Sequence, residues 1–167
     1  MPQVGRFHPI NPMPVARPQT AASVVALLKP LSRGLTLSVG SSEGDEKVKT
    51  VVSTNKFSGK ITGATLEKFL KVPTSVKFES QSASAFFKKT VAEWRDRAKT
   101  ETDPARKKQI TDNANKLEKL ATVMKNNLTE VQLFQDTNQD HVSGRVFIVG
   151  KAHDGKLVGL ETRRIWT

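Results

Sequence analysis

Two segments in the middle of the chain place apolar residues every three or four positions, the spacing of one face of an α-helix. Ser82 or Ser84 can cap the first segment by accepting a free backbone N–H. Asp103 can cap the second, and Pro104 stands in its first turn, where a missing N–H costs nothing. The apolar positions are Phe87, Val91, Trp94 and Ala98, then Ile110, Leu117, Leu120, Ala121, Met124 and Leu128. The pattern predicts two long helices, the second running to about Asn127.

Shorter patterns precede these helices. Residues 22–28 predict a helix that stops at Pro30, because a residue before proline disfavours the α region. Leu35, Leu37 and Val39 alternate with polar neighbours, which predicts an extended segment before a polar loop at 40–46. The remaining elements expected here are a strand at 48–54, a helix at 65–71 and a brief strand around 76–78.

The C-terminal third is typical of an antiparallel meander. Val131 and Leu133 alternate with polar residues, and a polar loop separates them from an apolar strand at 146–149. Asp154-Gly155 supplies turn chemistry, since this pair tolerates positive φ. The returning strand continues to Thr167. We therefore expect an α+β fold that closes with a hairpin.

The N-terminal segment differs from the rest. Residues 1–21 hold five prolines and no hydrophobic period, and proline removes backbone donors and fixes φ. We interpret this segment as a disordered tail in front of a domain at 22–167. The alternative is that the tail is an export leader of a bacterial secretion system.

Composition narrows the function classes. The net charge is +11, which favours an acidic partner, although solvated lysine faces give the same total. There is no cysteine, which removes disulfides, thiol catalysis and cysteine zinc sites and fits a cytoplasmic protein. The longest apolar run, at 24–28, is far below the roughly 20 residues that span a bilayer. A membrane partner is not expected.

The sequence carries no recognisable catalytic pattern. His8, His141 and His153 are scattered and lack metal-ligand spacing, and no Gly-rich phosphate loop or nucleophile elbow occurs. Glu43, Asp45 and Glu46 cluster, which is typical of a polar surface loop. We therefore expect a binding protein and not an enzyme, with no cofactor and no metal of its own.

The last residues carry a resemblance to a known family. The stretch VFIVGKAHDGKLVGLETRRIWT, residues 146–167, resembles the closing hairpin of the nuclease A inhibitor family. The helix exit NNLTEVQLF at 126–134 and Phe86-Phe87 are similar to that family as well. Residues 27–52, with Glu43 in their loop, resemble its first helix and acidic loop.

The resemblance implies an α/β/α sandwich around an antiparallel sheet. It also implies a mechanism in which a terminal threonine carboxylate and a loop glutamate approach the catalytic Mg²⁺ of a nuclease, largely through water. Carboxylate oxygens suit this role because they are hard ligands, like those of phosphate. On this chain the two groups are Thr167 and Glu43.

The chain departs from the family pattern near its end. Trp166 replaces the usual acid, and Arg163 and Arg164 stand just upstream, so these three join the expected partner-binding residues. Family inhibitors tend to be acidic, whereas this chain is basic.

Two alternatives therefore stay open. One is a secreted bacterial module that binds a host protein. The other, ranked behind it, is nucleic-acid binding through Lys88, Lys89, Arg95, Arg106, Lys107 and Lys108.

Overall fold

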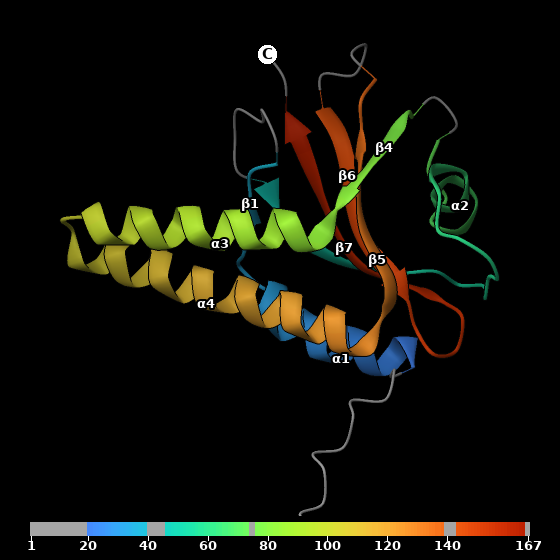
Figure 1. Cartoon of the computed structure of the whole chain (residues 1–167), viewed down its shortest axis with the longest axis horizontal. Coiled ribbons are helices and arrows are strands. Elements are labelled where there is room, and N and C mark those ends of the chain that lie inside the picture. The colour runs from blue at the N-terminus through green and yellow to red at the C-terminus, as the bar shows by residue number, and fades with distance from the viewer. Residues whose placement is uncertain (1–19, 40–45, 74–75, 139–142, 166–167) are drawn as a thin grey trace, which may run out of the picture.

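A five-stranded antiparallel sheet forms the centre of the protein in the computed structural model, which describes residues 20–39, 46–73, 76–138 and 143–165 (Figure 1). The strands lie in the order β3-β7-β6-β5-β4. Their bounds are β3 Lys49–Val52, β4 Phe78–Ser82, β5 Thr129–Asp136, β6 Ser143–Lys151 and β7 Leu157–Ile165. The predicted C-terminal meander is confirmed, because β5, β6 and β7 pair in sequence order.

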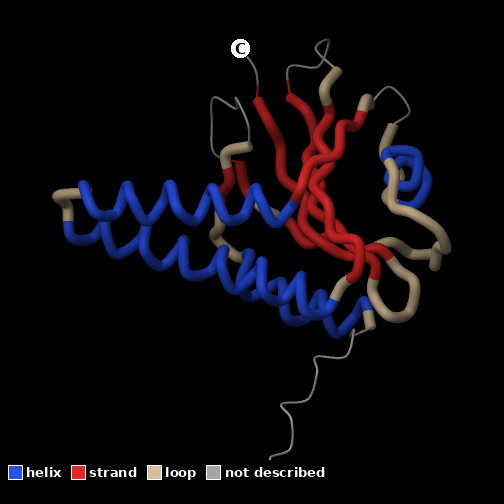
Figure 2. Tube along the Cα trace, in the orientation of Figure 1, coloured by secondary structure: helices blue, strands red, loops and turns tan. Residues whose placement is uncertain are grey.

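Helices cover both faces of this sheet. Three of them, α1 (Ala21–Ser32), α3 (Ala83–Thr100) and α4 (Pro104–Asn127), pack on one face. The short α2 (Gly63–Phe69) packs on the other, and Figures 1 and 2 show it on the far side of the strands. This arrangement confirms the expected α/β/α layers. A further pair of two-residue strands, β1 (Thr36–Leu37) and β2 (Glu46–Lys47), lies beside the sheet.

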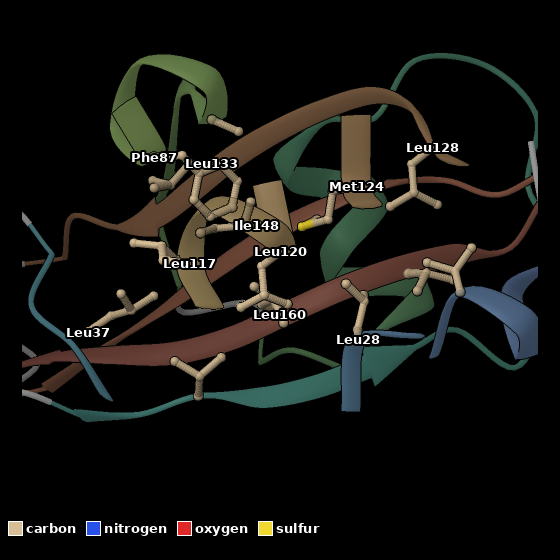
Figure 3. Packing of buried hydrophobic residues seen from close by; sticks show 14 of the residues in the cluster. Leu28, Leu37, Phe87, Leu117, Leu120, Met124, Leu128, Leu133, Ile148 and Leu160 are labelled. Carbon is tan, nitrogen blue, oxygen red and sulfur yellow. The ribbon is translucent and has the colours of Figure 1, made fainter. Parts of the chain in front are cut away.

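Side-chain alternation along the strands builds two separate hydrophobic layers. Leu133, Ile148 and Leu160 point towards α1, α3 and α4, where Figure 3 shows them packed with residues such as Leu120. The next residue along β5, Phe134, joins the layer beneath α2. Because successive side chains of a strand point to opposite faces, continuous apolar runs are buried on both sides.

The helix caps agree with the expectations from the sequence. Ser82 caps α3 by accepting the N–H of Ala85 at 3.2 Å. Asp103 caps α4, with Pro104 at the first helical position, and the helix ends at Asn127 as predicted. The α3–α4 pair extends well beyond the sheet as a long helical hairpin (Figure 2).

The prediction that the first helix stops at Pro30 is wrong. Pro30 lies inside α1, which continues to Ser32. Only the hydrogen bond that a residue at this position would donate to Ala26 is lost, and both residues are exposed, so water can solvate the carbonyl. Packing of Leu31 and burial of Ser32 hold the last turn in place.

Small shifts occur at the other predicted elements. The strand expected at 48–54 is β3, and the helix expected at 65–71 begins earlier, at Gly63, behind a capping box formed by Thr62 and Thr65. The strand expected around 76–78 begins at Phe78. The predicted tail falls almost wholly in residues 1–19, outside the described part of the chain, and stays a prediction. None of the helices in the described ranges is both long and apolar enough to cross a membrane.

Candidate functional site

The candidate site lies at the end of β7, where the chain approaches its last two residues. Of the five residues expected to bind a partner, Glu43, Trp166 and Thr167 lie outside the described residues. Arg163 and Arg164 lie on β7 itself. The site is therefore built from these two arginines and from the residues that flank the other three.

Arg163 and Arg164 point to opposite faces, as neighbours on a strand must. Arg163 is exposed, and its Nη1 donates to Ser143 Oγ at 3.4 Å. Arg164 is half-buried, and burial lowers the pKa of its guanidinium, while the charges of Asp136 and Glu79 act in the opposite direction. An arginine stays charged under all ordinary conditions. Arg163 is thus the better placed of the two to meet a partner.

A hydrogen bond connects the acidic loop to the terminal strand. The Thr162 hydroxyl donates to the backbone carbonyl of Glu46 at 3.2 Å, and Thr162 is buried. Glu46 begins β2 and directly follows residues 40–45, the segment that contains Glu43. On the other side of that segment, Val39 is buried in the core. The loop therefore starts and ends on fixed positions, one of them bonded to β7.

A partly buried ion pair orders the same end of the sheet. Arg145 on β6 and Glu161 on β7 approach to 2.6 Å, and their side chains are 27% and 16% exposed. Arg145 also lies over the Phe147 ring, 4.9 Å from its centroid. Arg145 stands directly opposite Arg163 in the register, and like charges so placed repel. Glu161 offsets this repulsion and leaves Arg163 available at the surface.

The described residues contain no obvious metal site. Within residues 20–39, 46–73, 76–138 and 143–165, no three His, Asp or Glu side chains gather into a group that could hold a metal ion. What the site offers instead is a strand end with an exposed guanidinium, next to the anchored flank of an acidic loop. Such an arrangement suits contact with another macromolecule.

Comparison with known proteins agrees with this geometry. A family model described as nuclease A inhibitor-like protein matches residues 22–167. The chain belongs to the nuclease A inhibitor-like family. The resemblance seen in the closing hairpin is thereby confirmed, as is the expectation of a binding protein and not an enzyme. Family membership indicates a nuclease inhibitor-like, protein-binding role. A comparison with curated proteins found no match.

Three contributors to the site of this nuclease A inhibitor-like protein were not assigned a role from the sequence. They are Thr162, which bonds the loop flank, and the Arg145–Glu161 pair. Glu161 and Thr162 stand inside the GLET motif that carried the resemblance. Strand alternation would place Thr162 on the same face as Leu160, hence inside, and a buried hydroxyl needs a partner. The identity of that partner follows from tertiary structure alone.

Proposed function

We propose that this protein inhibits a metal-dependent nuclease by presenting two carboxylates, those of Glu43 and Thr167, to the metal in the nuclease active site. Arg163, Arg164 and Trp166 form the surface around them. The metal belongs to the partner, and the inhibitor contributes oxygen ligands without a bond that the nuclease can cleave.

The observation that carries this proposal is the hydrogen bond between Thr162 and Glu46, together with family membership. Glu43 is three residues from Glu46, and Thr167 is five residues from Thr162. A chain spans at most about 3.6 Å per residue, so the Cα atoms of Glu43 and Thr167 can be no further than about 11 and 18 Å from those of Glu46 and Thr162, respectively. Both carboxylates can therefore reach the same partner site.

The positive charge of the chain bears on which nuclease is bound. With a net charge of +11, association with a nuclease that has a basic rim is slowed by repulsion. A nuclease whose metal site is surrounded by carboxylates attracts the chain, and the exposed Arg163 guanidinium can bind such a carboxylate in a bidentate manner. We therefore expect the partner to carry an acidic rim and the association rate to fall with salt.

The test uses a panel of Mg²⁺-dependent nucleases that differ in surface charge. Stoichiometric inhibition of at least one is expected, with a complex that survives gel filtration. Glu43→Gln, deletion of Thr167 and a C-terminal glycine extension should each weaken inhibition at least tenfold. An extension of the same length at Met1 serves as the matched control and should have no effect.

A basic protein can also slow a nuclease by covering its DNA, so the assay must separate these routes. An active-site inhibitor forms a complex with the nuclease in the absence of DNA, and its effect follows the inhibitor-to-enzyme ratio. DNA coverage instead requires that the chain bind DNA directly, follows the inhibitor-to-DNA ratio and slows every nuclease in the panel alike. If no nuclease in the panel is inhibited, or if the C-terminal extension leaves inhibition unchanged, the proposal is wrong. Equal inhibition of every nuclease in the panel, with direct binding to DNA and no complex with a nuclease, would favour nucleic-acid binding instead.

A further inference from the structure

Helices α3 and α4 lie close together at their connection and diverge towards the sheet (Figure 1). At the wide end they enclose a groove of about 620 Å³, closed on its third side by the start of β5. This volume falls within the range of about 300–1,000 Å³ that is typical of small-molecule sites. The groove lies on the helical layer, away from Arg163 and the candidate inhibitory surface.

The floor of the groove is apolar. Phe87 from α3, Met124 from α4 and Leu128, which directly follows α4, are buried, and Figure 3 shows all three among the core residues. Val91 and Val131 line the groove and remain partly exposed. An apolar ligand seated here would cover these side chains and displace water from them, which favours binding.

The rim of the groove is cationic on both sides. Lys88 on α3 and Lys125 on α4 line it and are exposed, and neither forms an ion pair within the described part of the chain. Glu118, the acid on the rim, is paired with Arg95 across the two helices. Two exposed lysines thus flank an apolar groove whose carboxylate is already paired.

We propose that this groove binds a small amphiphilic anion, an unbranched alkyl carboxylate whose tail lies on the apolar floor and whose head contacts Lys88 and Lys125. The size of the groove favours a small ligand over a protein. Twelve residues line it, whereas a stable protein interface uses about 20–30 residues on each side. The inference is independent of nuclease inhibition.

The test titrates the full chain with sodium decanoate at submicellar concentration. Binding is followed by calorimetry and by amide chemical shifts. Saturable shifts are expected at Val91, Ala121 and Val131, with none at Arg163. Decanol has the same tail without the charge and should bind about three- to tenfold more weakly, since two exposed ion pairs are lost.

Two variants make the result specific to this groove. Lys88→Gln with Lys125→Gln should weaken decanoate about three- to tenfold and leave decanol unchanged. The matched control is Lys89→Gln with Lys119→Gln, which removes the same charge from exposed positions that do not line the groove. Ala121→Phe fills the groove from a partly exposed position and should abolish binding of both ligands.

Three results would overturn the proposal. Absence of saturable shifts with decanoate shows that the groove takes no such ligand. Equal affinity for decanoate and decanol shows that the lysines do not recognise the head. Binding of an acidic amphipathic peptide at this groove, with decanoate inactive, identifies a protein-docking surface and not a small-molecule site.

Discussion

Gly159 lies where the backbones of β6 and β7 leave no room for a Cβ, so a single methyl group there should be poorly tolerated. It stands between Val149 on β6 and Val51 on β3 in the register. A Cβ at this position would lie 2.8 Å from the Cα of Val149 and closer still to the carbonyl oxygen of Ile148. Both atoms belong to the backbone of β6, so neither can move aside as a flexible side chain would.

The expected cost of Gly159→Ala follows from that geometry. Carbon atoms pack at about 3.5–4.0 Å, so the two strands must separate by about 1 Å. Overpacking of this kind costs about 1–3 kcal/mol, and weakening of the adjacent ladder hydrogen bonds adds about 1 kcal/mol. We expect a total of about 3 kcal/mol, a large part of the roughly 5–15 kcal/mol by which a domain is stable.

Urea unfolding followed by circular dichroism measures this loss. With a slope of about 2 kcal/mol per molar urea, the midpoint should fall by about 1.5 M. Gly34→Ala is the matched control, because Gly34 has φ +73° with no atom within 4 Å of an added Cβ. It should cost about 1–2 kcal/mol from left-handed strain alone. A Gly159→Ala midpoint within about 0.25 M of wild type, equivalent to roughly 0.5 kcal/mol, would refute the argument from close strand approach.

Three further substitutions test contacts elsewhere in the fold. Ser53→Ala removes the acceptor of the buried Leu157 N–H, 2.9 Å away, and should cost about 1–3 kcal/mol in urea unfolding; a loss near zero would mean that the amide finds another acceptor. Asp154→Ala removes the carboxylate that accepts the N–H of Ala21 at 3.2 Å. The stability of α1 should fall by about 1 kcal/mol, and its amide hydrogens should exchange faster as a result. Unchanged exchange would contradict this role. Arg95→Ala breaks an exposed ion pair between α3 and α4 and should cost less than about 1 kcal/mol, a difference that shrinks in high salt; a larger or salt-independent loss would show that packing dominates.

Local patterns determined most of the secondary structure. The two long helices were predictable because their caps and apolar stripes depend on residues that are neighbours in sequence, as at Ser82 and Asp103. The closing hairpin was predictable for the same reason, with Gly155 at φ +83° in its turn. The end of the first helix was predicted wrongly, because tertiary packing of the residues after Pro30 overcomes the local bias of proline against helix.

The site was predictable in part. Arg163 was identified from its position near the end of the chain, and the structure places it exposed on β7. The bond between Thr162 and Glu46 was not predictable, because 116 residues separate its partners and no local pattern specifies such a contact. The groove between α3 and α4 likewise depends on how far two packed helices diverge, which sequence spacing does not encode.

The sequence by itself determined the helices, the terminal meander, the family and the excess of positive charge. The charge follows from composition. The helices and strands follow from hydrophobic period and capping chemistry, which act over a few residues. Tertiary structure alone decided that β3 pairs with β7 and β4 with β5, that the acidic-loop flank is bonded to β7, and where an apolar groove opens beneath two lysines. Those features arise from packing between distant segments, where the free energy of burial, and not local preference, selects the arrangement.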